Sequence, residues 1–266
     1  MRPGYRLGLL ALAHLASGVL LGGYCAAVGG RLPGFALPLA PLVTLLALAL
    51  GQACLLGFWA ALSRGPRWLR LGGLAAGAVY LEALVSYGLR EDDLRLVATI
   101  SVATISVVSA AALLAARRGR AELRRVVPAE RVPPREGLRF SIRGLMLTTL
   151  IVATLLGGAR AVRQAFGHFT PSLFASAVLA VSLVVLALAA GWAALGVARP
   201  AGRACAVLAC AVAYGGLFAY GVSEDRDWEP IAYFVIVVAG QSAAVLASLL
   251  VARSAGYRLV AAPRPT

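Results

Sequence analysis

Residues 37–62 read LPLAPLVTLLALALGQACLLGFWAAL, an apolar run that contains no charged side chain. The run exceeds the ~20 residues that an α-helix needs to cross ~30 Å of hydrocarbon. It does not alternate polar and apolar residues as a strand of a membrane barrel would. Because hydrocarbon requires every backbone N–H and C=O to be paired internally, a helix is the stable form of such a segment. The run therefore predicts a membrane-spanning helix.

Seven further runs of the chain have the same character. Apolar residues make up 61% of the sequence and charged residues 14%, whereas soluble domains are usually ~45–50% apolar. The first run is longer than the ~7–15-residue core of a signal peptide, which favours a retained helix. The sequence predicts an all-α fold, a polytopic membrane helical bundle of eight transmembrane helices: Leu7–Ala27, Leu37–Leu62, Leu69–Leu89, Arg95–Ala116, Phe140–Arg160, Pro171–Ala198, Arg203–Val222 and Pro230–Ala252.

The run at 37–62 has a counterpart 133 residues further along the chain. Trp and Pro are scarce here, so their coincidence carries more weight than matches of Ala or Leu. Since four spans return the chain to the side from which it started, the matches predict a parallel duplication of a four-helix unit. The pairs at this offset are Pro38 with Pro171, the WAAL of 59–62 with that of 192–195, Tyr87-Gly88 with Tyr220-Gly221, and Glu91-Asp92 with Glu224-Asp225.

The predicted units are residues 1–116 and 140–266, joined by a basic linker at 117–139. The linker has two interpretations. Its arginines can hold anionic lipid headgroups, at ~1 kcal/mol for each residue near the surface. Alternatively they only anchor the topology, which the general excess of positive charge on cytoplasmic loops favours. The candidate headgroup contacts are Arg117, Arg118, Arg120, Arg124 and Arg125.

All 25 basic residues are arginines, and they set the orientation. With eight spans, most of them fall on one side of the membrane together with both termini. The positive-inside rule makes that side cytoplasmic, which predicts a multi-pass protein of the cytoplasmic membrane. The net charge of +14 could suit nucleic acid. The arginines lie between apolar runs and not along one exposed helix face, so we expect the lipid bilayer and no nucleic acid as partner.

One segment resembles a known group of proteins. Residues 139–158 read RFSIRGLMLTTLIVATLLGG. This segment is similar to one in uncharacterised membrane proteins of planctomycete type, where F-S-[IL]-R leads into a Leu/Thr-rich spanning helix. The resemblance implies a bacterial inner-membrane location and no activity. The matching residues are Phe140, Ser141, Ile142, Arg143, Leu145, Thr148 and Thr149.

A few polar residues lie inside the predicted spans and form a candidate intramembrane site. Glu82 is in the third span, and an ionisable group in hydrocarbon is a site hypothesis by default. It can bind a proton or a cation, or it can be neutral and hydrogen-bond neighbouring helices. Hydrogen bonding is favoured, because the second copy has Gly215 at the equivalent position. The same holds for the other members of the layer, which are His14, Gln52, Gln241 and Thr104.

Catalytic signatures are missing from the sequence. Without lysine there is no Walker lysine and no Schiff-base lysine. The two histidines and four cysteines form no metal-binding spacing, so we expect no metal and no cofactor. The predicted function is that of a non-enzymatic integral membrane protein that organises partners or lipids. The alternative is a small-solute or ion transporter with a polar layer around Glu82.

Overall fold

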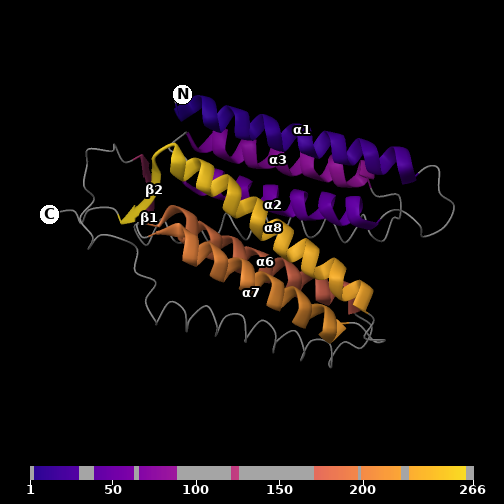
Figure 1. The fold of residues 1–266 in the computed structure, drawn as a ribbon. Helices are drawn as coiled ribbons and strands as arrows, with labels where there is room; N and C mark the ends of the chain where they lie inside the picture. The colour runs from indigo at the N-terminus through magenta and orange to yellow at the C-terminus, as the bar shows by residue number, and fades with distance from the viewer. Residues whose placement is uncertain are drawn as a thin grey trace.

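The computed structural model describes residues 3–29, 39–62, 66–88, 121–125, 171–196, 199–222 and 228–261. Six helices account for most of these residues, and all six are long and apolar enough to cross a membrane. The chain is therefore a largely helical, multi-pass membrane protein. The helices are α1 (Pro3–Gly29), α2 (Leu39–Leu62), α3 (Arg67–Gly88), α6 (Pro171–Leu195), α7 (Pro200–Val222) and α8 (Trp228–Ser254) (Figure 1).

These helices confirm six of the eight predicted spans, with ends that differ by at most four residues. The other two predicted spans, Arg95–Ala116 and Phe140–Arg160, lie outside the described residues. So do the segment 139–158 that carries the resemblance, Thr104, and three linker arginines, Arg117, Arg118 and Arg120.

The helices run antiparallel in sequence order and form one bundle (Figure 1). α1, α3 and α7 run in one direction, and α2, α6 and α8 run in the other. α8 crosses the bundle diagonally and contacts α2 as well as α6 and α7. It is therefore the helix that joins the N-terminal group of helices to the C-terminal group.

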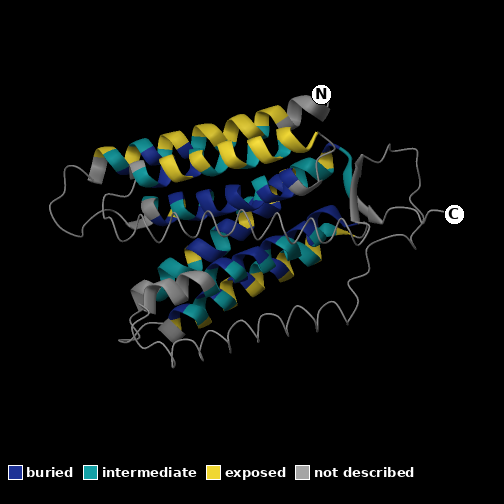
Figure 2. Cartoon of the chain, turned by 180° about the vertical axis from the view of Figure 1, so that it is seen from behind, coloured by how far each residue is buried: buried dark blue, intermediate teal, exposed yellow. Residues whose placement is uncertain are grey.

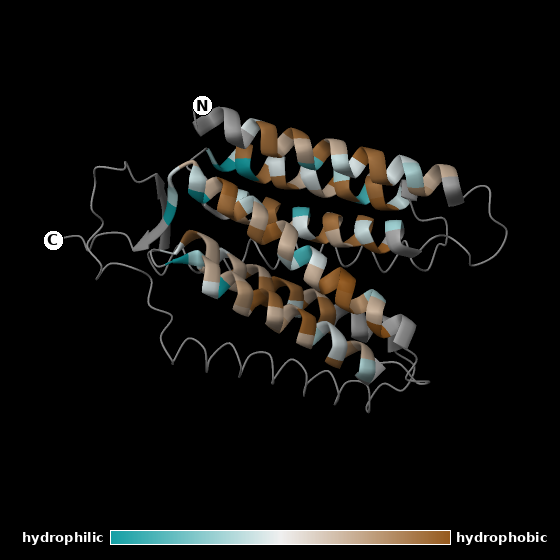
Figure 3. Ribbon diagram, in the orientation of Figure 1, coloured by the Kyte–Doolittle hydropathy of each residue, from teal (hydrophilic) through white to brown (hydrophobic). Residues whose placement is uncertain are grey.

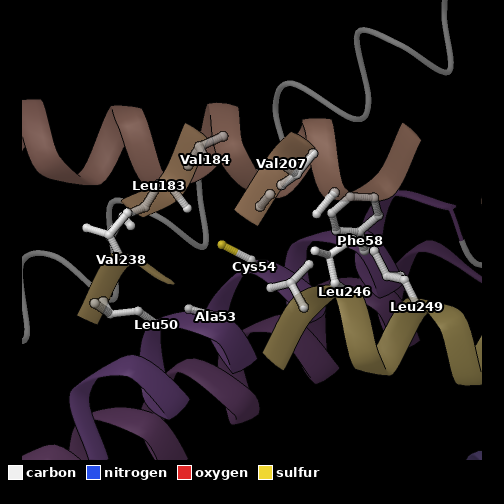
Figure 4. Close-up of a cluster of buried hydrophobic side chains, with 14 of the residues drawn as sticks. Leu50, Ala53, Cys54, Phe58, Leu183, Val184, Val207, Val238, Leu246 and Leu249 are labelled. Atoms are coloured by element: carbon white, nitrogen blue, oxygen red, sulfur yellow. The ribbon is translucent and has the colours of Figure 1, made fainter. Parts of the chain in front are cut away.

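The core lies where α2, α6 and α8 meet (Figure 4). Cys54 and Phe58 of α2 pack against Leu183 of α6 and Leu246 of α8, and all four side chains are buried. The outer faces of α1, α3 and α7 are exposed and also apolar (Figures 2 and 3). A bundle that is apolar inside and outside is what a bilayer requires, because lipid replaces water around it. Large exposed side chains include Leu12, Leu20, Leu71 and Leu217.

A short antiparallel sheet accompanies the helices of this almost entirely helical chain. β1 (Ala121–Arg125) comes from the linker and β2 (Tyr257–Ala261) follows α8. The chain leaves α8 through Gly256, whose φ of 95° lies in the left-handed region that glycine tolerates. Gly256 N–H donates to Arg253 O at 3.0 Å and closes the helix end. The linker and the C-terminal segment are thus held together at one end of the bundle (Figure 1).

Glycines allow close contact between helices at several points. The most restrictive is Gly215 of α7, where an added Cβ would lie 2.9 Å from Val235 Cα and 3.1 Å from Phe234 O of α8. Both neighbours are backbone atoms, which cannot rotate away as a side chain can. Small residues at such points let helix backbones pack closely in membranes. The α7–α8 interface therefore depends on a glycine at this position.

Candidate functional site

The structure brings part of the predicted polar layer together. The His14 side chain of α1 makes a hydrogen bond through Nε2 to Ser248 Oγ of α8 at 2.7 Å. Gln52 of α2 donates from Nε2 to the carbonyl oxygen of His14 at 3.0 Å. These bonds connect α1, α2 and α8 in the interior of the bundle. Ser248 was not among the predicted residues.

Gln241 of α8 lies on the other side of α2 and is completely buried. Its Nε2 donates to Cys54 Sγ at 3.3 Å, and its Oε1 accepts from Ser242 Oγ at 3.3 Å. Both polar atoms of the amide therefore have a partner. A buried amide with partners on two residues holds helices in register and leaves no polar atom for a solute. His14, Gln52 and Gln241 thus each make a hydrogen bond to a neighbouring helix.

Glu82 does not join this cluster. Its neighbours Leu81, Leu84 and Val85 are buried, whereas Glu82 itself is exposed on α3. The face of α3 toward α1 is marked by Tyr80, whose hydroxyl donates to Leu15 O at 3.5 Å. Glu82 therefore points away from the polar residues that the transport hypothesis would need around it.

Arginines gather at one end of the bundle. The arginines in the described part of the chain are Arg6, Arg67, Arg70, Arg124, Arg125, Arg199, Arg203, Arg253 and Arg258. They lie where α1, α3 and α7 begin, where α2, α6 and α8 end, and in the strands (Figure 1). This one-sided arrangement matches the side that the sequence predicts to collect positive charge.

Several of these arginines satisfy carbonyl groups at helix C-termini. The last carbonyls of a helix have no partner within the helix, and a cation there also suits the helix dipole. Arg70 of α3 donates to Ala60 O near the end of α2 at 3.3 Å. Arg253 of α8 donates to Ala194 O of α6 at 2.8 Å and to Gly196 O just beyond it. These bonds fix the basic end of the bundle.

Two more arginines complete this end. The guanidinium carbon of Arg203, in the first turn of α7, lies 4.0 Å from the ring centroid of Trp192 on α6. Arg258 of β2 donates from Nη1 to Arg253 O at 2.7 Å and to Tyr257 O at 2.8 Å. Burial lowers the pKa of Arg258, yet a guanidinium stays protonated at neutral pH. The end therefore carries several permanent positive charges.

Of the predicted headgroup contacts, Arg124 and Arg125 belong to β1. The register places Arg124 opposite Arg258 and Arg125 opposite Tyr257. The structure thereby links the linker arginines to arginines that the sequence analysis did not select, namely Arg203, Arg253 and Arg258. The sequence contained one indication of Arg253. The segment LLVAR at 249–253 is similar to LLAAR at 113–117, and it ends on Arg253 as the other ends on the first linker arginine.

No group of three or more His, Cys, Asp or Glu residues in the described ranges is close enough to hold a metal ion. Comparison with protein-family models, with curated protein sequences and with solved structures finds no match to this chain. The function must therefore be argued from the residues themselves.

Proposed function

We propose that this chain spans the inner membrane of a bacterium eight times as two parallel copies of a four-helix unit. In this proposal the arginine-rich end is cytoplasmic and holds anionic lipid headgroups. The role is non-enzymatic. The chain organises lipids around a rigid bundle.

The duplication is supported by the helices themselves. Adding 133 to the bounds of α2 gives residues 172–195, and α6 is Pro171–Leu195. Adding 133 to the bounds of α3 gives residues 200–221, and α7 is Pro200–Val222. Each helix also runs in the same direction as its counterpart. Arg70 and Arg203 are equivalent by this offset, and both contact the helix that precedes their own.

The number of spans is supported by where the described segments begin and end. α3 ends at the end of the bundle opposite to β1, and α6 begins opposite to β1 as well (Figure 1). Residues 89–120 and 126–170 therefore each connect opposite ends. A single crossing needs ~20 residues and three would need about 60, so one crossing fits each segment. Two crossings added to six make eight.

The observation that carries the lipid role is the β1–β2 pair. It fixes linker residues Arg124 and Arg125 beside the C-terminal segment, at the end where the helix-flanking arginines gather. Arginine forks match the geometry of phosphate oxygens. A preformed basic surface at headgroup depth is suited to anionic lipid more than to a charged solute crossing the membrane.

The lipid role predicts a preference for phosphatidylglycerol. The protein is placed in nanodiscs of phosphatidylcholine that contain a minority of phosphatidylglycerol. When it is released from the nanodiscs in native mass spectrometry, it should keep bound phosphatidylglycerol in preference to phosphatidylcholine. Changing Arg117, Arg118, Arg120, Arg124 and Arg125 to Gln should largely remove this selectivity, because each contributes ~1 kcal/mol near the surface.

The matched control changes five arginines to Gln. The eight predicted spans place these five on the side opposite to the linker, and they are Arg31, Arg90, Arg95, Arg160 and Arg163. This variant has the same net charge and should keep most of the selectivity. Equal losses in the two variants, or no selectivity in the wild type, would argue against a lipid role for the basic end.

The proposed orientation predicts which positions a membrane-impermeant thiol reagent reaches from outside the cell. In a variant without native cysteines, Glu91→Cys and Asp225→Cys should be labelled, because both follow spans that end outside. Arg120→Cys and Val260→Cys should be labelled only after the membrane is opened. Labelling of position 120 in intact cells would reverse the orientation.

The transport alternative makes a different prediction for Glu82. Since this side chain is exposed on α3, Glu82→Gln should change the free energy of unfolding by less than about 0.5 kcal/mol. It should also leave any pH-dependent ion flux in proteoliposomes unchanged. Gln52→Leu is the contrast, because it removes a buried interhelical bond worth about 0.6–1.7 kcal/mol. A flux that is present in the wild type and lost in Glu82→Gln would restore the transport hypothesis.

A further inference from the structure

Three half-buried guanidiniums meet where α6 ends, α7 begins and α8 passes into β2. Arg253 is bonded on both sides of the junction. Its guanidinium donates to carbonyl groups at the end of α6, and its own carbonyl oxygen accepts a hydrogen bond from Arg258. Arg203 is held over the ring of Trp192, also at the end of α6. The charges of Arg258 and Arg203 both repel that of Arg253. The fold therefore concentrates positive charge at this junction.

The β1–β2 register adds a fourth arginine position. Arg124 lies directly opposite Arg258, and like charges at directly opposite positions destabilise an antiparallel pair. One acidic position, Glu122, is two residues away and opposite Val260. The strand pair therefore brings further basic sequence positions beside the three guanidiniums. An anion bound between the strands and the helix ends would remove the repulsion.

The donors of Arg258 are only partly used by these contacts. A guanidinium carries five N–H donors, and the two bonds of Arg258 both come from Nη1. Its Nε and Nη2 donors lie outside those bonds. Arg203 keeps a planar fork while it stacks on Trp192, an arrangement that suits arginine and not lysine. Forks of this kind bind two oxygens of a phosphate at once.

We expect the junction to lie at the depth of lipid headgroups. It is formed at the ends of three apolar helices, next to Trp192, which is half-buried. Tryptophan favours the membrane–water interface, with its ring against the acyl boundary. A phosphate that reaches the arginines from the membrane would leave its acyl chains beside the apolar helix surface. A soluble phosphate would lack that contact.

We propose that Arg203, Arg253 and Arg258 form a binding site for the phosphate of one anionic phospholipid, with Trp192 against its glycerol backbone. This site deepens the lipid role proposed above and rests on it. It assigns selectivity to a junction of three helices and not to the linker as a whole.

The test uses Trp192 as a reporter. In the full-length chain carrying Trp59→Phe, Trp68→Phe and Trp228→Phe, brominated phosphatidylglycerol in phosphatidylcholine nanodiscs should quench Trp192 at a low mole fraction. Brominated phosphatidylcholine should not. Arg203→Gln should raise the mole fraction for half-quenching about fivefold, the effect of ~1 kcal/mol for one arginine. Arg203→Lys should recover part of the affinity.

Arg199→Gln is the matched control, because Arg199 is exposed four residues earlier and its change removes the same charge. It should shift half-quenching clearly less than Arg203→Gln does, because Arg199 belongs to the basic end but lies outside the junction, and thermal unfolding should show that both variants fold. Equal shifts for Arg199→Gln and Arg203→Gln would overturn the site, while the selectivity for phosphatidylglycerol in native mass spectrometry would still uphold the general lipid role. Relief of quenching by glycerol phosphate would overturn the lipid assignment in favour of a soluble phosphate. Absence of selectivity in the wild type would remove the general role as well.

Discussion

Gly215→Leu should abolish the packing of α7 on α8 and leave little folded protein. A Cβ at this position would lie 2.9 Å from Val235 Cα, 3.1 Å from Phe234 O and 3.3 Å from Val235 N. Because these are backbone atoms of the facing helix, the helices must separate to admit any side chain. Overpacking by a single methyl group usually costs about 1–3 kcal/mol, and a leucine adds three more carbons. Separation would also expose the core side of α8, which contacts α2, α6 and α7.

The adjacent Gly216 supplies the control. Among the described residues, a Cβ there would meet Val235 Cγ2 at 3.9 Å, which is an ordinary van der Waals contact. Gly216→Leu should therefore elute as a monodisperse species in mild detergent and unfold near the wild-type temperature, whereas Gly215→Leu should aggregate. Gly215→Ala should fold with a lowered unfolding temperature. Similar behaviour of the two leucine variants would mean that the α7–α8 contact is looser than described.

The helices were predictable because the bilayer imposes a length. The run at 37–62 contains no charge and became α2, Leu39–Leu62. α1 and α7 begin three or four residues earlier than predicted, at Pro3 and Pro200, and the first turn of each contains an arginine, Arg6 or Arg203. An arginine in the first turn extends toward the headgroups along its apolar stem, so the helix starts before the apolar run.

The polar layer was only partly predictable. Periodicity marks the buried face of a helix in water, but these helices are apolar all round. Nothing in the sequence of α3 therefore distinguishes exposed Glu82 from buried Leu81. The depth of a residue along its helix was enough to predict that His14 and Gln52 lie close together, because α1 and α2 pack against each other. Depth alone could not predict the position of Glu82, because tertiary packing decides which way its side chain faces.

The strand pair was not predicted because its partners are far apart in sequence. β1 reads AELRR and β2 reads YRLVA, and no hairpin turn joins these two short segments. Only the return of α8 to the end where the linker lies brings them together. The arginine junction shares this origin, since Arg124 and Arg258 are neighbours through the fold alone.

From the proposed duplication we expect residues 95–116 to form a helix that relates to α6 as α8 relates to α2. In the described contact, a Cβ at Gly240 of α8 would lie 3.1 Å from the Cβ of Ala47 on α2. Shifting both positions by 133 residues, the offset that relates Glu91 to Glu224 before the same pair of helices, gives Val107 and Ala180. Disulfides form when Cβ atoms are ~3.5–4.5 Å apart, so both pairs should crosslink after a small adjustment.

The measurement is oxidation of double-cysteine variants that lack Cys25, Cys54, Cys205 and Cys210, followed by cleavage at a protease site inserted in the linker. Both pairs connect the two halves across the linker, so a disulfide keeps the fragments together on a non-reducing gel. Ala47→Cys with Gly240→Cys is the positive control. Val107→Cys with Ala190→Cys is the negative control, because Ala190 is ~15 Å further along α6 than Ala180.

The duplicated eight-helix bundle predicts that Val107→Cys with Ala180→Cys crosslinks as completely as the positive control, and that the pair with Ala190→Cys does not. The duplication would be contradicted if the positive control crosslinks while the variant with cysteines at 107 and 180 stays reduced and separates into two fragments.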